Sequence, residues 1–587
     1  MGSPLVRAAF ALIVGATIAA FFVTQRLKGE FPLVIRFAAS PNTISPNGDG
    51  VRDGTSVGFD LSEPAKVSFS VVDSEGNEVR RLVDNRPLAG DAKHRYFWNG
   101  RDQDGRRVPD GTYRLRVVRR DEGRVINSLK KVKVDTRPPK VRLTSARPGV
   151  IAPGDPGQQP RVTIRYRGPR NGAPEFRIFR TDEGPPRVVA RFRGDKERRA
   201  VWHGSLRGRP AVDGDYAFTV TVRDTAGNRA VSPTDIPTAR LARPGTGVAV
   251  RHLTLAGPLG AVRAGALAGL VVGPYTHSFG FSLSRVGSRR VVKRGRRVGG
   301  RFRVRVPPRA RTGLYLVRVQ AGRHRAVWPL AVNARSRRRG PLVVLPAISW
   351  QGRNRVDDDL DGFADTLDSS RSIGLGRPFA GGGTPPGLAG QAAPLLRFLD
   401  RERLPYELTT DLSLARHQGP SLGTEPGVAL AGGSRWLTPE LLRRLRRYVE
   451  AGGRLASFGS DALRRSVRLG AASLHDPTTA HRENALGERT ALLRAPPAPL
   501  SVEQDRLGLF RSRFVGEFSI FERSAGLPRG ARRLAAAGRD PGQPAFIAYR
   551  LGRGLVVRVG TPQWTRATSS AEVSGVTKRM WALLRRR

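Results

Sequence analysis

The chain has 587 residues, 39% of them hydrophobic and 26% charged, which is ordinary for folded protein and too long for one hydrophobic core. Lys and Arg number 102 against 49 Asp and Glu, a formal net charge of +53, and there is no Cys. The lack of Cys excludes disulfides, thiolate metal sites and Cys nucleophiles.

The positive charge is carried almost entirely by Arg, and the Arg residues are spread along the whole chain. The densest runs lie at 335–339, in an expected linker, and at the terminus, 585–587. A nucleic-acid site gathers basic residues on one face or in one segment. We therefore interpret the charge as an Arg-rich compositional bias and expect no specific nucleic-acid partner. Attraction to anionic envelope polymers or lipid head groups remains the alternative.

The first expected element is an apolar helix at 8–23, in which Thr17 is the only polar side chain. Sixteen residues is near the short end of a membrane-spanning helix, about 17–25. The alternative is a cleaved signal peptide with Arg7 as its basic region. The apolar run continues to Val23 with no small-x-small site after it, which favours an uncleaved anchor. We expect residues 1–30 to form a membrane anchor and its flank, with the bulk of the chain extracytoplasmic.

From 33 to 235 the sequence shows short alternating runs interrupted by Gly, Asp, Asn and Pro, the pattern of a β-sandwich. The sequence FWNG at 97–100, followed by PDGTYRL at 109–115, recurs as VWHG at 201–204 and VDGDYAF at 212–218. The repeat predicts two copies of one domain, at 33–137 and 138–240, with Trp98 and Trp202 as core anchors.

These motifs resemble the immunoglobulin-like domain of flagellar hook-assembly scaffold proteins and of many bacterial surface proteins. SPNGDGVRD at 45–53 is similar to the N-terminal signature of such repeats. The resemblance implies a spacer or scaffold role and no chemistry. Within this signature, Asn47, Asp49 and Asp53 form a weaker candidate metal site, for which the alternative is a simple Asn-Gly/Asp-Gly turn.

A third β-rich domain is expected at 247–334, and a different architecture at 340–587. Runs at 342–345 and 428–431 are typical of buried strands, and 438–451 has apolar residues at helical spacing. Thr438 is the expected N-cap of that helix, Pro439 opens it and glycines end it. Strand-helix-strand alternation predicts an α/β domain with a mainly parallel sheet. The whole is thus a multidomain protein: an N-terminal transmembrane helix, two or three immunoglobulin-like sandwiches and an α/β domain.

Five phrases of this last region, at 343–346, 350–354, 406–411, 438–455 and 550–560, occur in an order that resembles the C-terminal region of the N,N-dimethylformamidase large subunit. That resemblance covers about 248–587. It implies a core with the class I glutamine-amidotransferase-like α/β fold.

The family's activity is not expected to carry over with the fold. The fold's usual nucleophile is a Cys, and the family uses iron held by tyrosines and a glutamate. Arg353 stands before Asn354 where the family tends to have Tyr, and 432–436 reads GGSRW in place of a His-Pro-Glu-Tyr-Trp-like segment. A protonated Arg cannot ligate iron. We therefore expect no catalytic residues and no iron, with a metal-dependent hydrolase of C–N bonds as the alternative.

One metal-binding pattern is present, in DDDLDGFADTLD at 357–368. Carboxylates at positions 1, 3, 5, 9 and 12 with Gly at 6 match a calcium loop of EF-hand type, with Asp in place of Glu at 12. The carbonyl of the residue at position 7 completes the set. The expected ligands are Asp357, Asp359, Asp361, Phe363, Asp365 and Asp368. The alternative is a solvated acidic loop. Together these features predict a membrane-anchored surface protein with a calcium-stabilised, non-catalytic binding domain.

Overall fold

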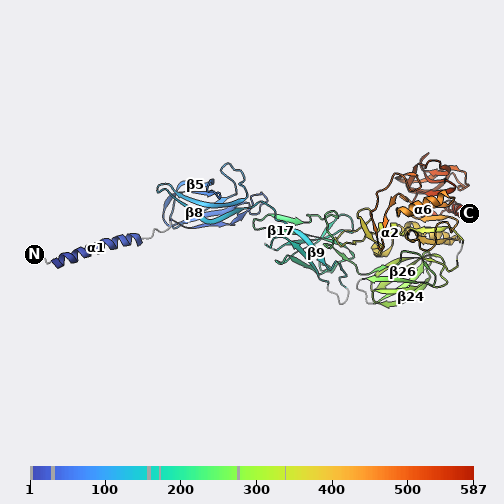
Figure 1. Cartoon of the computed structure of the whole chain (residues 1–587), viewed down its shortest axis with the longest axis horizontal. Helices are drawn as coiled ribbons and strands as arrows, with labels where there is room; N and C mark the ends of the chain where they lie inside the picture. Colours follow the sequence, from blue (N-terminus) through green and yellow to red (C-terminus); the bar gives the residue numbers. More distant parts are fainter. Residues whose placement is uncertain are drawn as a thin grey trace.

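The computed structural model describes residues 4–27, 33–154, 160–170, 173–273, 278–336 and 339–586. The molecule is elongated, with helix α1 (Pro4–Leu27) at one end, two β-sandwiches in a row after it, and the remaining domains gathered at the other end (Figure 1). In the described part of the chain one helix is long and apolar enough to cross a membrane, over Pro4–Val23. This fits a membrane anchor and a signal sequence equally.

The first sandwich packs a three-stranded sheet on a five-stranded one. In sheet order the strands are β1 (Val34–Ser40), β3 (Thr55–Leu61) and β6 (Lys93–Trp98), then β2 (Thr43–Ile44), β8 (Arg124–Val134), β7 (Gly111–Arg119), β4 (Ala65–Val72) and β5 (Glu78–Leu88).

The second sandwich repeats this plan with sheets of three and six strands and a small hairpin. The strands are β14 (Arg199–Trp202), β11 (Val162–Arg167) and β9 (Arg142–Arg147); β10 (Val150–Ile151), β19 (Val248–Val250), β17 (Gly214–Arg223), β12 (Glu175–Arg180) and β13 (Arg187–Arg193), with β18 (Arg229–Ser232) beside β17; and the hairpin β15 (Ser205–Leu206) and β16 (Arg209–Pro210). Strand β19 lies within the range expected for the third domain, yet it pairs with β10 and β17 of the second.

The repeated motif makes the same core contacts in both sandwiches. The indole N–H of Trp98 donates to the Arg101 carbonyl at 2.9 Å, and its ring lies 5.3 Å from that of Tyr113. In the second copy Trp202 donates to the Ser205 carbonyl at 2.9 Å and lies 5.4 Å from Tyr216. Both tryptophans are buried, as predicted. The motif recurs because each core is closed by the same indole-phenol pair.

The third sandwich has sheets of three and five strands. Its strands are β20 (Thr254–Ala256), β22 (Leu267–Gly273) and β25 (Arg301–Arg305), then β21 (Val262–Arg263), β27 (His324–Asn333), β26 (Gly313–Ala321), β23 (Ser278–Arg285) and β24 (Val291–Val298). Its buried side chains form one continuous core with those of the C-terminal domain, whereas each of the first two sandwiches has a core of its own. The third sandwich is thus packed onto the C-terminal domain.

The C-terminal domain is built on a nine-stranded sheet. The order is β30 (Glu407–Thr410), β28 (Leu342–Leu345), β31 (Val428–Ala431), β33 (Arg454–Phe458), β41 (Gly554–Val559), β40 (Pro544–Leu551), β39 (Arg532–Gly538), β37 (Arg489–Asp505) and β38 (Phe514–Gly526). The first five strands pair in parallel and the pairs from β41 to β38 are antiparallel. The sheet is therefore mixed, whereas the sequence predicted a mainly parallel one.

Helices cover the parallel half of this sheet. They include α2 (Ala347–Gly352), α4 (Ala393–Arg401), α5 (Asp411–Ala415), α6 (Pro439–Glu450) and α8 (Ala571–Arg585). Helix α6 matches its prediction: the Thr438 hydroxyl accepts from the Leu441 amide at 3.2 Å, and Leu441, Leu445 and Val449 are buried. Shorter elements are α3 (Ala380–Gly383), η1 (Leu388–Ala392), α7 (Trp564–Ala567), β29 (Ser372–Gly374), β32 (Trp436–Leu437), β34 (Arg465–Ser466), β35 (Arg468–Leu469) and β36 (Ser473–His475).

Candidate metal centre

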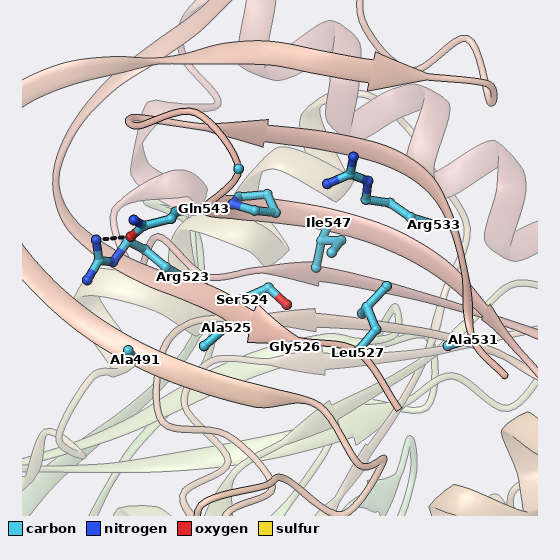
Figure 2. A pocket seen from close by; sticks show the side chains of 12 residues that line it. Ala491, Arg523, Ser524, Ala525, Gly526, Leu527, Ala531, Arg533, Gln543 and Ile547 are labelled. Carbon is cyan, nitrogen blue, oxygen red and sulfur yellow. Dashed lines mark hydrogen bonds between the residues drawn. The ribbon is translucent and has the colours of Figure 1, made fainter. Parts of the chain in front are cut away.

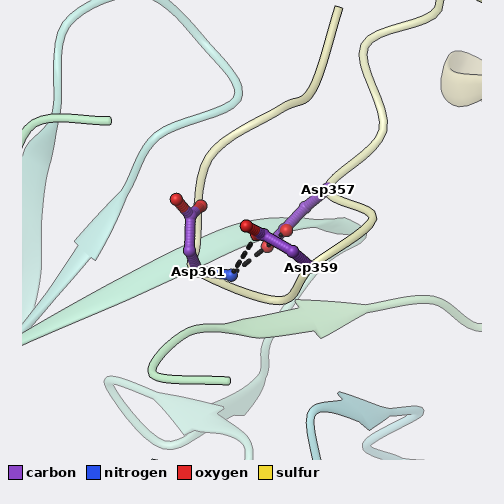
Figure 3. A group of neighbouring side chains, drawn as sticks. All are labelled: Asp357, Asp359 and Asp361. Carbon is purple, nitrogen blue, oxygen red and sulfur yellow. Dashed lines mark hydrogen bonds between the residues drawn. The ribbon is translucent and has the colours of Figure 1, made fainter. Parts of the chain in front are cut away.

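The sequence 357–368, here called the acidic loop, lies between α2 and β29, on the side of the C-terminal domain that faces the second sandwich. Carboxylate oxygens of Asp357, Asp359 and Asp361 all lie within 4.8 Å of one another (Figure 3). This is the one group of three or more potential metal-ligating side chains found among the described residues. The alternation predicted by the sequence thus brings positions 1, 3 and 5 of the loop together.

The loop is wound by hydrogen bonds from its own backbone to these carboxylates. The Asp361 amide donates to Asp357 Oδ1 at 3.2 Å and Asp359 Oδ1 at 3.1 Å, and the Gly362 amide donates to Asp357 Oδ2 at 2.8 Å. Gly362 has φ of 92°, and a Cβ there would lie 2.8 Å from Ala217 of the second sandwich. Glycine is therefore required at position 6 both for the turn and for the close approach.

The remaining expected ligands are placed differently. Asp365 accepts from the Asp358 amide and from Ser370 Oγ, each at 2.7 Å, and lines a hollow of about 350 Å³ together with Asp359, Asp361 and Phe363. Asp368 does not belong to this group and forms an ion pair with Arg435 at 2.9 Å. Three of the six expected ligands therefore lie close together, and Phe363 and Asp365 line the adjoining hollow. Asp368, the expected ligand at position 12, pairs with Arg435 instead.

The crowding raises the pKa values of the cluster. Burial, with repulsion from neighbouring carboxylates, raises the pKa of Asp357 to about 8 and that of Asp361 to about 7, and raises the pKa of Asp359 as well. Without a cation the cluster therefore holds protons near neutrality. A hard divalent cation that takes carboxylate oxygens can displace these protons, so the donor set fits calcium.

A pH dependence of stability follows. In the cation-free protein these carboxyls have folded-state pKa values above the unfolded value of about 4, so the folded state holds more protons than the unfolded state between about pH 4 and 8. Stability then falls as pH rises through this window. We expect thermal unfolding in EDTA to occur several degrees lower at pH 8 than at pH 5. The Asp357→Asn/Asp361→Asn variant should show a clearly smaller difference, because it lacks two of the buried carboxyls whose pKa values are raised. An unchanged difference in the variant would assign the pH dependence to other buried carboxyls.

The loop is also the contact between two domains. The Gly245 amide donates to the Asp359 carbonyl at 2.8 Å, the Gly247 amide donates to the Leu360 carbonyl at 2.7 Å, and Thr181 Oγ1 donates to the Gly362 carbonyl. Asp215, buried at the start of β17, adds to the repulsion on Asp357 and is paired with Arg251. The sequence contains one clue to this contact: Asp215 occupies the place that Thr112 has in the first copy of the repeat.

The weaker candidate of the first sandwich has a structural role. Asp53 accepts from the Gly48 amide at 2.7 Å and the Gly50 amide at 2.8 Å, Asn47 accepts from the Asp49 amide at 2.9 Å, and Asp49 accepts from the Val51 amide at 2.8 Å. Beside this turn, the Ser45 hydroxyl donates to Asn228 of the second sandwich at 2.5 Å. These side chains are engaged in local turns next to an interdomain contact, which favours the turn interpretation.

Guanidinium groups lie at the positions where the sequence departs from the N,N-dimethylformamidase pattern. Arg435 bridges Asp368 and Asp461, at 2.9 Å each, and lies 4.7 Å from the centroid of the Trp436 ring. Arg353 is exposed at the end of α2. Arg435 therefore supplies the positive charge between these two carboxylates.

Asp411 is a further buried carboxyl, at the carboxyl end of β30. It accepts from the Ile348 amide at 2.9 Å, and burial raises its pKa to about 8. It is thus protonated near neutrality and holds the start of α2 against α5. Spacing in the sequence did not single it out as a site residue.

A separate hollow of about 530 Å³ lies over the antiparallel strands β37–β40 (Figure 2). Arg523 and Arg533 line it, and Arg523 donates to Gln543 across one end. Among the residues that the structure describes, its lining includes no carboxylate, His or Lys. It can accommodate a ligand, but its side chains do not include a pair suited to general acid-base catalysis.

Comparison with protein families gives two matches. Residues 300–519 match the model described as N,N-dimethylformamidase beta subunit-like, C-terminal, and residues 42–123 match the FlgD Ig-like domain. The basal-body rod modification protein FlgD of Salmonella typhimurium is 33% identical over 89 residues, 14% of this chain and 38% of that protein, and the protein of the same name in Salmonella typhi gives the same values. The chain spans well under half the length of these curated relatives.

Among solved structures, similarity is low. A beta-galactosidase from Bacillus circulans sp. alkalophilus has 14% sequence identity and a TM-score of 0.23, covering 32% of this chain and 26% of that one. The human OSCAR ligand-binding domain has 19% identity and a TM-score of 0.19, covering 33% of this chain and 92% of that one. These scores are too low to indicate a common overall fold. The family matches confirm both resemblances predicted from the sequence: an FlgD-type Ig-like domain precedes a region similar to the C-terminal part of the N,N-dimethylformamidase beta subunit.

Proposed function

We propose that this chain is a membrane-anchored, extracytoplasmic surface protein whose C-terminal domain binds a ligand without catalysis and is held to the second sandwich by calcium. The observation that carries the proposal is the group Asp357, Asp359 and Asp361, whose crowded carboxylates lie in the loop that contacts the second sandwich. A cation there would remove the repulsion and fix the loop on which the interdomain contact depends.

The anchor and the location rest on the first part of the chain. The described side chains of α1 are all exposed, which is costly in water and favourable in a bilayer. Sandwich domains in a row then extend away from it (Figure 1). Such an arrangement is suited to carrying the C-terminal domain away from a membrane.

The non-catalytic assignment rests on the surroundings of Arg435. The class I amidotransferase-like fold implied by the resemblance normally depends on a Cys, and the chain has none. Arg435 lies between two carboxylates where a metal-dependent relative would need ligands that bind a cation. A ligand-binding role that retains the fold is consistent with both features.

A second candidate, a hydrolase of C–N bonds, is favoured by the match of residues 300–519 to the N,N-dimethylformamidase beta subunit-like model. Such an enzyme would act on small amides and would hold its metal with residues other than Arg353 and the 432–436 segment, where this sequence departs from the family pattern.

One experiment on the full chain in detergent distinguishes the binding protein from the hydrolase. Calcium binding is measured by calorimetry, bound metals are determined in the purified protein, and release of amine from dimethylformamide and related amides is followed. We expect one calcium per chain, lost in Asp359→Ala and kept in the control Asp104→Ala, a substitution in an exposed turn of the first sandwich. Bound iron or zinc with metal-dependent turnover would establish the hydrolase instead.

A further inference from the structure

The acidic residues of this chain are distributed unevenly. At the chain-wide frequency of 49 in 587, a stretch of 121 residues would contain about ten Asp or Glu, yet 236–356 contains none. The range 247–334 nevertheless carries 17 Arg and Lys. A general Arg-rich bias raises the number of arginines everywhere, but it does not remove carboxylates from one domain. The third sandwich is therefore selectively cationic.

The charge is densest along one edge of this sandwich. Strands β24 and β25, joined by Gly299-Gly300, are the outermost strands of its two sheets. We call 289–309 the basic edge. It carries ten cationic side chains, all exposed: Arg289, Arg290, Lys293, Arg294, Arg296, Arg297, Arg301, Arg303, Arg305 and Arg309. Among the described residues, none of these ten has a carboxylate within ion-pair distance. The edge thus presents its full charge to solvent.

The strand register organises these charges into rows. Arg294 and Arg296 of β24 lie opposite Ser282 and Gly280 of the neighbouring strand β23. On its other side, Ser282 lies opposite Arg318 of β26. On β25, alternate arginines lie about 7 Å apart along one side of the strand. The small residues of β23 therefore lie between arginines of β24 on one side and Arg318 of β26 on the other. Such rows fit a chain-like partner that carries one negative charge every few ångströms.

We infer that the basic edge binds a linear polyanion, a flexible polymer with repeated phosphate or carboxylate groups, through charge alone. Its position favours a polymer over the bilayer of α1, because β24 lies at the margin of the third sandwich, at the end of the molecule remote from α1 (Figure 1). Its composition favours a polymer without bases, since the exposed large hydrophobic residues in the described part of this domain are aliphatic and offer no stacking platform. Exposed unpaired arginines are the groups that phosphate and carboxylate bind best.

The test uses the full chain in detergent, with long-chain inorganic polyphosphate and poly-L-glutamate as probes. Binding is measured by fluorescence anisotropy between 50 and 300 mM NaCl, salt concentrations chosen because counterion release makes such binding steeply salt-dependent. The edge variant replaces Arg294, Arg296, Arg301 and Arg303 with Gln. The matched control replaces Arg161, Arg165, Arg167 and Arg209 with Gln, exposed residues of the second sandwich, so that both variants lose the same net charge.

We expect the edge variant to bind at least tenfold more weakly at 100 mM salt and with a shallower salt dependence, and the control to change less than threefold. Equal weakening of both variants would overturn the inference in favour of diffuse attraction. Tighter binding of single-stranded RNA than of polyphosphate of equal charge would assign the edge to nucleic acid. Binding to anionic phospholipid vesicles without binding to either polymer would assign it to a lipid surface. Unchanged circular dichroism of both variants confirms that they are folded.

Discussion

We expect calcium to raise the unfolding temperature of the C-terminal part of this protein by about 5–10 °C at a calcium concentration 100 times the dissociation constant. A ligand at that excess stabilises the folded state by about 2.7 kcal/mol, and for a domain of this size each kcal/mol corresponds to about 2–4 °C. The physical reason is the repulsion among Asp357, Asp359 and Asp361, which a cation replaces by attraction. Differential scanning calorimetry with calcium or with EDTA measures the shift.

The variant Asp359→Ala distinguishes a metal ligand from a purely structural residue when its unfolding is compared in EDTA and in calcium. Removing one of three crowded carboxylates relieves repulsion, so in EDTA the variant should unfold at the wild-type temperature or slightly above it. In calcium it should fall below the wild type, because a ligand is missing. A purely structural Asp359 would lower the unfolding temperature equally under both conditions, and that pattern would contradict the metal site. The control Asp104→Ala should respond to calcium as the wild type does.

The second large effect is expected at a buried ion pair in the antiparallel half of the C-terminal sheet. Arg558 of β41 is buried and donates to both carboxylate oxygens of Glu488, at 2.9 and 3.0 Å, and to the Glu522 carbonyl at 2.8 Å. Replacing Arg558 with Met leaves the buried carboxyls of Glu488 and Glu522 without their cation. Loss of one partner of such a pair costs about 3–5 kcal/mol, so we expect thermal unfolding at least 6 °C below the wild type.

Two further variants test the cause. Arg550→Met removes an exposed arginine from the adjacent strand β40 and should change the unfolding temperature by less than 2 °C. Adding Glu488→Gln to Arg558→Met removes one stranded charge and should restore part of the loss. If the double variant were less stable than Arg558→Met, the packing of these side chains rather than their charge would explain the effect.

The sequence predicted well those features that depend on neighbours along the chain. The Trp98 and Tyr113 pair recurs as Trp202 and Tyr216 because one local motif closes both cores. Helix α6 was predicted with its cap because Thr438, Pro439 and the glycines after it are local signals. The approach of Asp357, Asp359 and Asp361 follows from alternation in one loop.

Features that depend on distant partners were not predicted. Strands β37 to β40 are joined by turns, so they pair antiparallel and make the sheet mixed, whereas strand-helix alternation in the earlier part suggested one parallel sheet. Asp368 fits position 12 of a calcium loop by spacing, but Arg435, 67 residues later, forms an ion pair with it. The contact between the acidic loop and the second sandwich joins residues more than a hundred positions apart, and only Asp215 hints at it.

Strand β24 also affects whether two molecules of this protein can pair through their sheet edges. As the last strand of its sheet, it exposes unpaired backbone amides and carbonyls, and valines at 291, 292 and 298 are exposed on it. Such an edge is a template for pairing with the same strand of another molecule, the first step of aggregation. Like charges on Lys293, Arg294, Arg296 and Arg297 oppose that pairing. The positive charges of this strand therefore act as gatekeepers against strand pairing between neighbouring molecules.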